Sequence, residues 1–252
     1  MVRLQYDGSG FSGWQRQRTG RTVQGEMEAV LERLCGRRIA AHAAGRTDAG
    51  VHAMGMAVSV TVPERWTPLD LRRAVNALLP RDCWVDEVVE MIPGFHARKQ
   101  AVTRSYEYRI GTDPASRSPF RRPFEWALER DLDEAALHLA GATILGSHEF
   151  RAFAVQTQEK PDCRCEVRTA QWCRREDAAG FSFGIVANRF LHHMVRILVG
   201  TMVDIALARR DPADLGRLLE SDPEVRASPP APPEGLYFMR ATYPTHCFPD
   251  LP

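Results

Sequence analysis

The sequence has almost no lysine and little net charge. Of its 33 basic residues only Lys99 and Lys160 are lysines, which leaves 31 arginines against 32 acidic residues and a formal net charge of +1. This balance argues against binding nucleic acid through an evenly spread positive charge. A codon bias towards Arg, Ala, Gly and Pro explains the bulk excess of arginine, so local clusters are the better evidence for a charged partner.

Long apolar runs and paired cysteine motifs are also missing. No run approaches the ~18–20 apolar residues that a membrane-spanning helix needs, and the chain starts on Val2–Tyr6 without a charged-then-apolar leader. These absences predict a cytoplasmic protein with no membrane partner. The six cysteines form no CxxC pair, so we expect reduced thiols and no structural zinc.

The apolar periodicity predicts an α+β fold in two parts. The expected elements of the first part are a strand at 2–6, a helix from Thr22, a strand at 54–60, a helix opened by Thr67 and Pro68, and a strand at 84–89. Those of the second part are a strand at 105–110, a helix at 133–145, a strand at 181–187, helices from Phe190 and from Asp211-Pro212, and a closing strand at 235–243. We expect mostly antiparallel sheets with helices on one face, and domains 1–99 and 100–252 joined near 93–100.

Basic residues cluster in two stretches. Between His96 and Arg122 seven basic residues stand against two acidic ones, and a second cluster at 14–21 places three arginines beside Trp14. Acidic residues gather elsewhere, at 125–134 and 211–224. A basic face with an acidic reverse is typical of RNA-binding proteins. The predicted RNA contacts are Arg16, Arg18, Arg98, Lys99 and Arg104.

The stretch Gly45–Ala53 is the most informative for chemistry. Asp48 lies between two glycines, two residues after Arg46, and directly precedes a predicted strand. A carboxylate on such a turn beside an arginine is kept ionised and points outward, as a nucleophile or base requires. The alternative is that Asp48 only closes an Asx-turn or caps a short element.

The segment Gly8–Gly13 matches GxGxxG after a strand, but we reject a dinucleotide site. In that fold the third glycine lies in a helix whose N-terminus meets pyrophosphate. Here the residues after Gly13 show no helical apolar period and include another glycine, Gly20.

The run Gly45–Ala53 resembles the active-site motif of the TruA family of tRNA pseudouridine synthases. Further similarities follow in the family's order along almost the whole chain. They are Tyr6–Gln17, Phe95–Arg98, Arg104–Tyr108, Phe190–Arg196 and Glu234–Tyr237.

The resemblance implies a fold and an activity. The fold is that of pseudouridine synthases, with two α/β-sandwich-like halves and the active-site cleft between the halves. The activity is isomerisation of uridine to pseudouridine in the anticodon stem-loop of tRNA, at uridines 38, 39 and 40. The family's homodimer would assemble a wide basic surface from a near-neutral chain. Neither a cofactor nor a metal is implied.

The same resemblance assigns roles to five residues. Asp48 is the nucleophile, and Arg196 is its basic partner, which lowers its pKa and orients it. The target base leaves its stack before reaction, and Tyr106 stacks on it while its hydroxyl assists the proton step at C5. Arg46 contacts the RNA backbone or holds the flipped nucleotide open. Leu236 lines the uracil pocket.

Each role has a plainer alternative. Tyr106 and Tyr108, two apart on a strand, share one sheet face and could both belong to the core. Arg196 could be a solvated helix residue, Arg46 could stabilise its own turn, and Leu236 could be core. The pair His192-His193 suggests a metal, but neighbouring helical residues point about 100° apart, so we expect packing or RNA contact instead.

Two other classes of protein are alternative interpretations of the whole sequence. A catalytically silent tRNA-binding protein could share the basic surface, although it has no need for a carboxylate such as Asp48 facing a polyanion. A metal-dependent nuclease would need carboxylates clustered for paired ions, and none cluster with Asp48 in the sequence. Activity in the presence of EDTA would exclude the nuclease.

Overall fold

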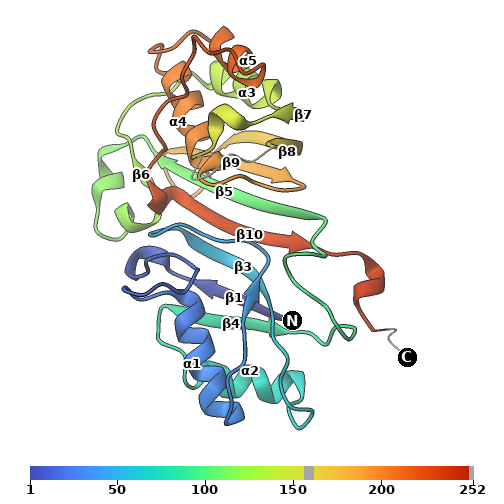
Figure 1. Ribbon diagram of the computed structural model, residues 1–252. Helices are drawn as coiled ribbons and strands as arrows, with labels where there is room; N and C mark the ends of the chain where they lie inside the picture. Colours follow the sequence, from blue (N-terminus) through green and yellow to red (C-terminus); the bar gives the residue numbers. More distant parts are fainter. Residues whose placement is uncertain (156–161, 250–252) are drawn as a thin grey trace. The chain divides into compact units, whose positions relative to one another are not determined.

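The computed structural model describes residues 1–155 and 162–249 and divides the chain into two compact units (Figure 1). The first unit is Met1–Arg104 together with the chain from Tyr237 onward, and the second is Ser105–Leu236. A single cut into 1–99 and 100–252 does not describe this division, because the closing strand returns to the first unit. Residues 156–161 and 250–252 of the predicted second domain lie outside the described residues.

The first unit is a mostly antiparallel sheet with two helices. Its strands run in the order β4-β1-β3-β10, and the short strand β2 also pairs with β3. Pairing is antiparallel except between β10 and β3, which are parallel. The strand bounds are β1 Val2–Tyr6, β2 His42–Ala43, β3 His52–Ser59, β4 Cys83–Val88 and β10 Leu236–Thr242.

The two helices of this unit begin where capping chemistry predicts. Helix α1, Val23–Cys35, is capped by Thr22, whose side chain accepts a hydrogen bond from the Gly25 backbone N–H. Helix α2, Pro68–Asn76, is capped in the same way by Thr67. A hydroxyl at this position satisfies a backbone donor that the helix leaves unpaired. The helices pack on each other, and α2 packs against β4.

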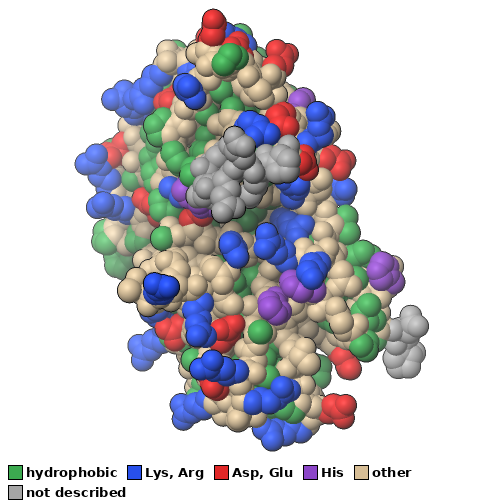
Figure 2. Space-filling view, in the orientation of Figure 1, with side chains coloured by type: hydrophobic (Ala, Val, Ile, Leu, Met, Phe, Trp, Pro, Cys, Tyr) green, Lys and Arg blue, Asp and Glu red, His purple; other side chains and the backbone are tan. Residues whose placement is uncertain are grey.

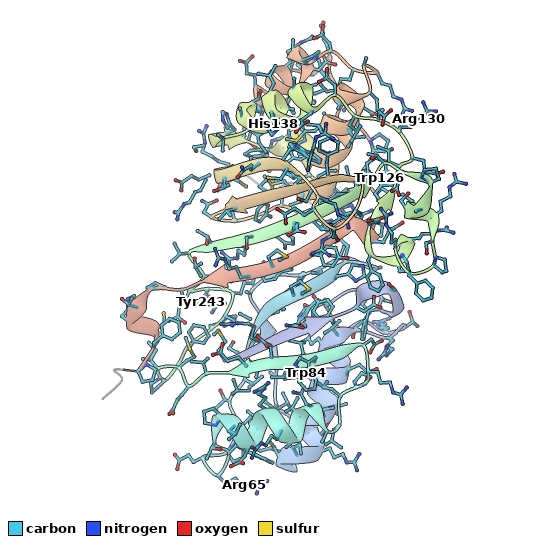
Figure 3. The ribbon with its side chains drawn as sticks, turned by 180° about the vertical axis from the view of Figure 1, so that it is seen from behind. Arg65, Trp84, Trp126, Arg130, His138 and Tyr243 are labelled. Atoms are coloured by element: carbon cyan, nitrogen blue, oxygen red, sulfur yellow. The ribbon has the colours of Figure 1, made fainter. Side chains whose placement is uncertain are left out.

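Over its described residues, the second unit is also built on a five-stranded sheet, here with three helices. Its strands run in the order β5-β9-β8-β7, and the short strand β6 pairs in parallel with β5. The strands are β5 Thr103–Gly111, β6 Trp126–Ala127, β7 Gly146–Glu149, β8 Arg164–Arg174 and β9 Gly180–Ala187. The helices are α3 Glu134–Thr143, α4 Met194–Ala206 and α5 Ala213–Leu219. In the view from behind, Trp126 marks β6, and Trp84 marks β4 of the first unit (Figure 3).

The core of the second unit lies where α4 covers the sheet. Trp172 of β8 stacks on Phe183 of β9 with ring centroids 4.8 Å apart, and its indole N–H donates to the Met202 sulfur of α4 at 3.4 Å. All three side chains are at least 99% buried. Burial of such large apolar groups is the main stabilising term of a domain of this size.

The mixed, mostly antiparallel fold and the predicted elements with strong periodicity are confirmed, whereas β8 was missed. In β8 the buried residues Cys165 and Val167 stand at odd-numbered positions, whereas the buried Trp172 stands at an even-numbered one. A register irregularity between Val167 and Thr169 shifts the alternation. Because a bulge inserts a residue, the period of two breaks in the sequence even though the strand continues.

The start of α4 also differs from the prediction. The helix begins at Met194 rather than at Phe190, because His193 adopts a left-handed conformation with φ 64°. The centroids of the His193 and His192 rings lie 4.0 Å apart. The expectation that these two rings diverge by a helical step was therefore wrong. Among the described residues no helix is long and apolar enough to span a bilayer.

None of the six cysteines, all of which lie within the described residues, forms a disulfide. Burial raises the pKa of Cys83 to about 12 and that of Cys165 to about 11, whereas Cys173 is exposed. Since only the thiolate is nucleophilic, we expect iodoacetamide at pH 8 to modify Cys173 first. Cys83 and Cys165 should react at least about 100-fold more slowly until the chain unfolds. Peptide mapping by mass spectrometry measures this, and fast labelling of Cys83 in the folded protein would contradict it.

Candidate active site

Asp48 lies on a tight turn between β2 and β3. The turn closes where the Val51 backbone N–H donates to the Asp48 carbonyl at 3.2 Å, and Gly50 within it has φ 79°. A residue with a Cβ resists this conformation, which accounts for the glycine after Ala49. The Asp48 side chain is half-buried. Asp48 therefore lies in the turn that directly precedes β3, as the sequence predicted.

The glycine-rich segment after β1 packs directly beneath this turn. A Cβ on Gly8 would lie well under 3.0 Å from the Val51 carbonyl, and a Cβ on Gly13 would lie 2.6 Å from the Thr47 carbonyl oxygen. Gly8–Gly10 form a single 3-10 turn, and the next helix begins only at Val23. The segment is therefore a close-packed support for the Asp48 turn, which explains its glycines without a dinucleotide.

Hydrogen bonds fix the residue before Asp48 at both its backbone and its side chain. The Trp14 backbone N–H donates to the Thr47 carbonyl at 3.0 Å, and the Thr47 hydroxyl lies 2.8 Å from the buried Tyr6 hydroxyl. Gly50 N–H adds a bond to the Phe11 carbonyl at 3.3 Å. Three contacts from the segment 6–14 thus restrict the turn on either side of the carboxylate, and preorganisation of this kind keeps a reactive group in place.

His52 is a buried residue in contact with the glycine-rich segment, and the sequence reasoning did not single it out. It is 2% exposed, its ring stacks on Tyr237 at 4.8 Å, and its Nδ1 accepts the Gly8 backbone N–H at 3.0 Å. The Asp7 carboxylate lies 3.2 Å from the same nitrogen. Because Nδ1 accepts from Gly8, we assign it the lone pair and the proton to Nε2. Its only sequence signal was its place within Gly45–Ala53.

Most of the basic residues predicted to contact RNA are exposed on the first unit. Arg46, Arg18, Arg98 and Lys99 are exposed, and Arg16 is exposed while its guanidinium donates to Glu28 at 3.2 Å. Lys and Arg side chains gather with histidines on the face seen in Figure 2. No hydrogen bond holds the Arg46 side chain to local carbonyls within residues 1–155 and 162–249, so its turn-stabilising alternative has no support.

Arg104 differs from the other predicted RNA contacts. Its guanidinium donates to the carbonyls of Ala44, Ala101 and Arg98. These bonds tie the segment 98–104 to the residue that precedes Gly45. Arg104 therefore braces the approach to the Asp48 turn, and its contact with RNA stays a prediction.

Tyr106 and Tyr108 share one buried face of β5 in the second unit. The Tyr108 hydroxyl donates to the Pro232 carbonyl at 2.7 Å, and burial raises its pKa well above the ordinary value. A Cβ on Gly235 would lie 2.6 Å from the Tyr108 ring. Tyr108 is thus a core residue. Tyr106 meets Phe190 edge to face, with ring centroids 4.9 Å apart.

Arg196 is anchored rather than solvated. Its Nε donates to the Ala231 carbonyl at 2.7 Å, and the Ala231 N–H donates to the Arg196 carbonyl at 2.9 Å. Gly200 on the same helix leaves no room for a Cβ, because the Pro229 carbonyl packs against it. The proline-rich loop 228–233 therefore orients the third residue of α4. Leu236 follows that loop as the first, buried residue of β10.

The predicted site residues thus fall into two groups, one in each unit. In the first unit the structure brings Asp48 together with supports from Tyr6, Gly8 and Trp14 and places Arg46 beside it in the turn. In the second unit it places Tyr106 on β5, Arg196 on α4 against the loop 228–233, and Leu236 at the start of β10.

Comparison with known proteins points to one family. The family model described as tRNA pseudouridine synthase matches residues 4–97 and 140–244. Curated relatives carry the name tRNA pseudouridine synthase A. That of Chlorobium luteolum is 40% identical over 245 residues, covering 96% of this chain and 94% of the relative. That of Moorella thermoacetica is 40% identical over 249 residues, covering 96% and 98%, and that of Geobacillus kaustophilus is 38% identical over 246 residues, covering 97% and 94%.

Proposed function

Since the chain belongs to the tRNA pseudouridine synthase family and is an isomerase of tRNA uridine, we propose that its targets are uridines 38, 39 and 40 of the anticodon stem-loop. These target positions follow from the family resemblance, and the observation that supports catalysis by this chain is the Asp48 turn. Its backbone is packed closely against Gly8–Trp14, and this packing supports a preorganised position of Asp48 just before β3. A protein that only binds RNA needs no such arrangement.

The reaction breaks the N1–C1′ bond of uridine, rotates the base and forms a C5–C1′ bond. The proton on C5 is lost and N1 gains one, so the atoms balance without a cofactor. We propose Asp48 as the nucleophile. A uracil within a stem or stacked loop must leave its stack first, which costs a few kcal/mol. We propose that Arg46, which is exposed two residues before Asp48, holds the nucleotide in the extruded position.

The second unit supplies the remaining groups of the proposal. Tyr106 stacks on the extruded base, Arg196 pairs with the Asp48 carboxylate, and Leu236 lines the uracil pocket. The two hydrogen bonds between Arg196 and Ala231 support such a role, because they hold both the backbone and the guanidinium Nε of Arg196. The cleft between two halves that these roles require belongs to the same proposal.

The RNA contacts and the assembly complete the proposal. Arg16, Arg18, Arg98 and Lys99 are exposed on the first unit and are proposed to bind phosphates. A homodimer would place two such basic surfaces on one tRNA, which compensates for a net charge of only +1.

Tritium release from tRNA that carries [5-³H]uridine tests the function directly, because only loss of the C5 proton releases the label. We expect release by the wild-type protein in the presence of EDTA. Sequencing the product after carbodiimide modification locates the new pseudouridines. Binding of that tRNA without tritium release would instead support the silent tRNA-binding protein, and release that requires a metal would contradict a metal-free isomerase.

Substitution of Tyr106 separates its ring from its hydroxyl. We expect Tyr106→Phe to lower turnover about 100-fold, since general acid–base assistance of a proton step contributes on this order. The Kd for tRNA should stay within about twofold, because the ring can still stack on the base. Tyr106→Leu should in addition weaken binding. Single-turnover tritium release and filter binding measure the two effects, and full activity of Tyr106→Phe would contradict the role of the hydroxyl.

A further inference from the structure

Phe120 is the most exposed large apolar side chain of the described residues. It is 87% exposed, whereas most of the other large apolar side chains on the surface are about half-buried. It lies at the tip of the loop 112–125 in the second unit, between Pro119 and Arg121. Burial of this ring by a partner would remove most of its apolar surface from water, which is favourable.

The loop that presents Phe120 is held by a network of charges. Arg121 makes two hydrogen bonds to the Asp113 carboxylate, at 2.9 and 3.0 Å, and its Nε lies 2.8 Å from Glu125. Glu125, whose side chain is 2% exposed, also pairs with Arg175, whose side chain is 9% exposed. The two arginines compensate the charge of this buried carboxylate. The base of the loop is therefore rigid.

Close packing adds to this rigidity. Ser116 is fully buried and its hydroxyl donates to the Asp113 carbonyl at 2.7 Å. Gly111 at the end of β5 leaves no room for a Cβ beside Ser116 and Glu125. The tip of the loop is thus an ordered part of the fold that keeps Phe120 in water.

The exposed charge at the tip is positive. Arg122 is exposed, and the described residues offer its side chain no carboxylate within 4 Å. Arg117 is 74% exposed and contacts Glu129, while Glu125 is directed into the buried network. An aromatic ring beside an uncompensated guanidinium fits a flat base attached to a phosphate. A partner that offers only an apolar groove does not fit this pair, because burying the Phe120 ring in such a groove would desolvate Arg122.

The loop also adjoins the proposed site of the second unit. The 3-10 turn Arg122–Phe124 packs against the turn Pro233–Gly235, which directly precedes Leu236. The strand β6 that follows the loop, marked by Trp126 in Figure 3, pairs with β5, the strand of Tyr106. A polynucleotide bound at this unit therefore has the loop within its reach.

We propose that Phe120 is an RNA-stacking residue, on which an unpaired base of the tRNA stacks while Arg122 binds an adjacent phosphate. The proposal rests on the proposed function for the identity of the RNA. The chemistry, a base and its phosphate, follows from the loop itself.

The test compares four variants in equilibrium binding to full-length unmodified tRNA. We expect Phe120→Ala and Phe120→Leu each to raise Kd about 5- to 100-fold, the range for loss of one base–aromatic stack. Phe120→Trp should bind at least as well as the wild type, because a larger π-face stacks better. Leu139→Ala, which removes a 61% exposed side chain from α3, is the matched control and should leave Kd unchanged. Arg122→Gln should reduce the slope of log Kd against log salt by about 1.

A photo-crosslinking residue at position 120 identifies the partner. Crosslinks to tRNA nucleotides support the proposal, whereas crosslinks only to a second copy of the chain overturn it. Equal retention of binding by Phe120→Leu and Phe120→Trp overturns it as well, since a purely apolar contact tolerates leucine. Failure of the wild-type protein to release tritium refutes the proposed function instead, and leaves the effect of these variants on Kd as a separate result.

Discussion

Asp48→Ala is expected to abolish isomerisation while leaving tRNA bound. Turnover in the tritium-release assay should fall by at least about 10⁴-fold, since removal of a catalytic nucleophile costs on this order or more. The Kd for tRNA should change by less than about threefold, because the carboxylate repels a polyanion rather than attracting it. The reason for expecting a local effect lies in the turn, which is held mainly by backbone contacts to Phe11, Trp14 and Val51.

Two further variants make the result specific. Asp48→Asn keeps the shape of the side chain and removes its charge, so it should be as inactive as Asp48→Ala. Glu64→Gln removes an exposed carboxylate from the same unit and should retain full activity. Thermal unfolding confirms that each variant is folded. Residual turnover above about 1% of wild type in Asp48→Ala, with folding intact, would remove Asp48 from the reaction.

The strongest sequence signals of the fold were those with local causes. Thr22 and Thr67 mark helix starts because a hydroxyl and a backbone N–H three residues later form one bond regardless of the rest of the fold. Strand β8 was not predicted, because the register irregularity between Val167 and Thr169 depends on its pairing with β9. The division of the chain after Arg104 depends on the pairing of β10 with β3, which joins segments far apart in the sequence.

The candidate site shows the same limit. Asp48 could be singled out because glycines on both sides mark a turn in the sequence itself. The support beneath it could not, because contacts of Gly8 with Val51 and of His52 with Gly8 join segments more than 40 residues apart. Arg104 was assigned to RNA from the charge of its stretch, yet three backbone carbonyls surround its guanidinium. Composition reports charge, but it does not report which charges are already bonded.

The support beneath Asp48 leads to the second large effect, which is expected for Gly8→Ala. A new methyl group there meets the Val51 carbonyl and the backbone of Gly50, neither of which can move like a side chain. We expect the free energy of unfolding to fall by about 3 kcal/mol, at the upper end of the cost of overpacking. Turnover of the folded fraction should fall about 100-fold, because an ångström of displacement of a reactive group costs on this order.

Gly10→Ala is the matched control for this prediction, because it lies in the same 3-10 turn. Its new Cβ would meet only the ends of the Arg21 and Asp82 side chains, at 3.4 and 3.6 Å, which are ordinary contacts. We expect its stability to stay within about 0.5 kcal/mol of wild type and its turnover to be unchanged. Chemical denaturation and single-turnover tritium release compare the pair. If Gly8→Ala matched Gly10→Ala in both measurements, the close packing of Gly8 against Val51 would not be what holds Asp48 in place. If only its stability fell, the support would serve folding, and the position of the carboxylate would depend on Thr47 and Trp14 instead.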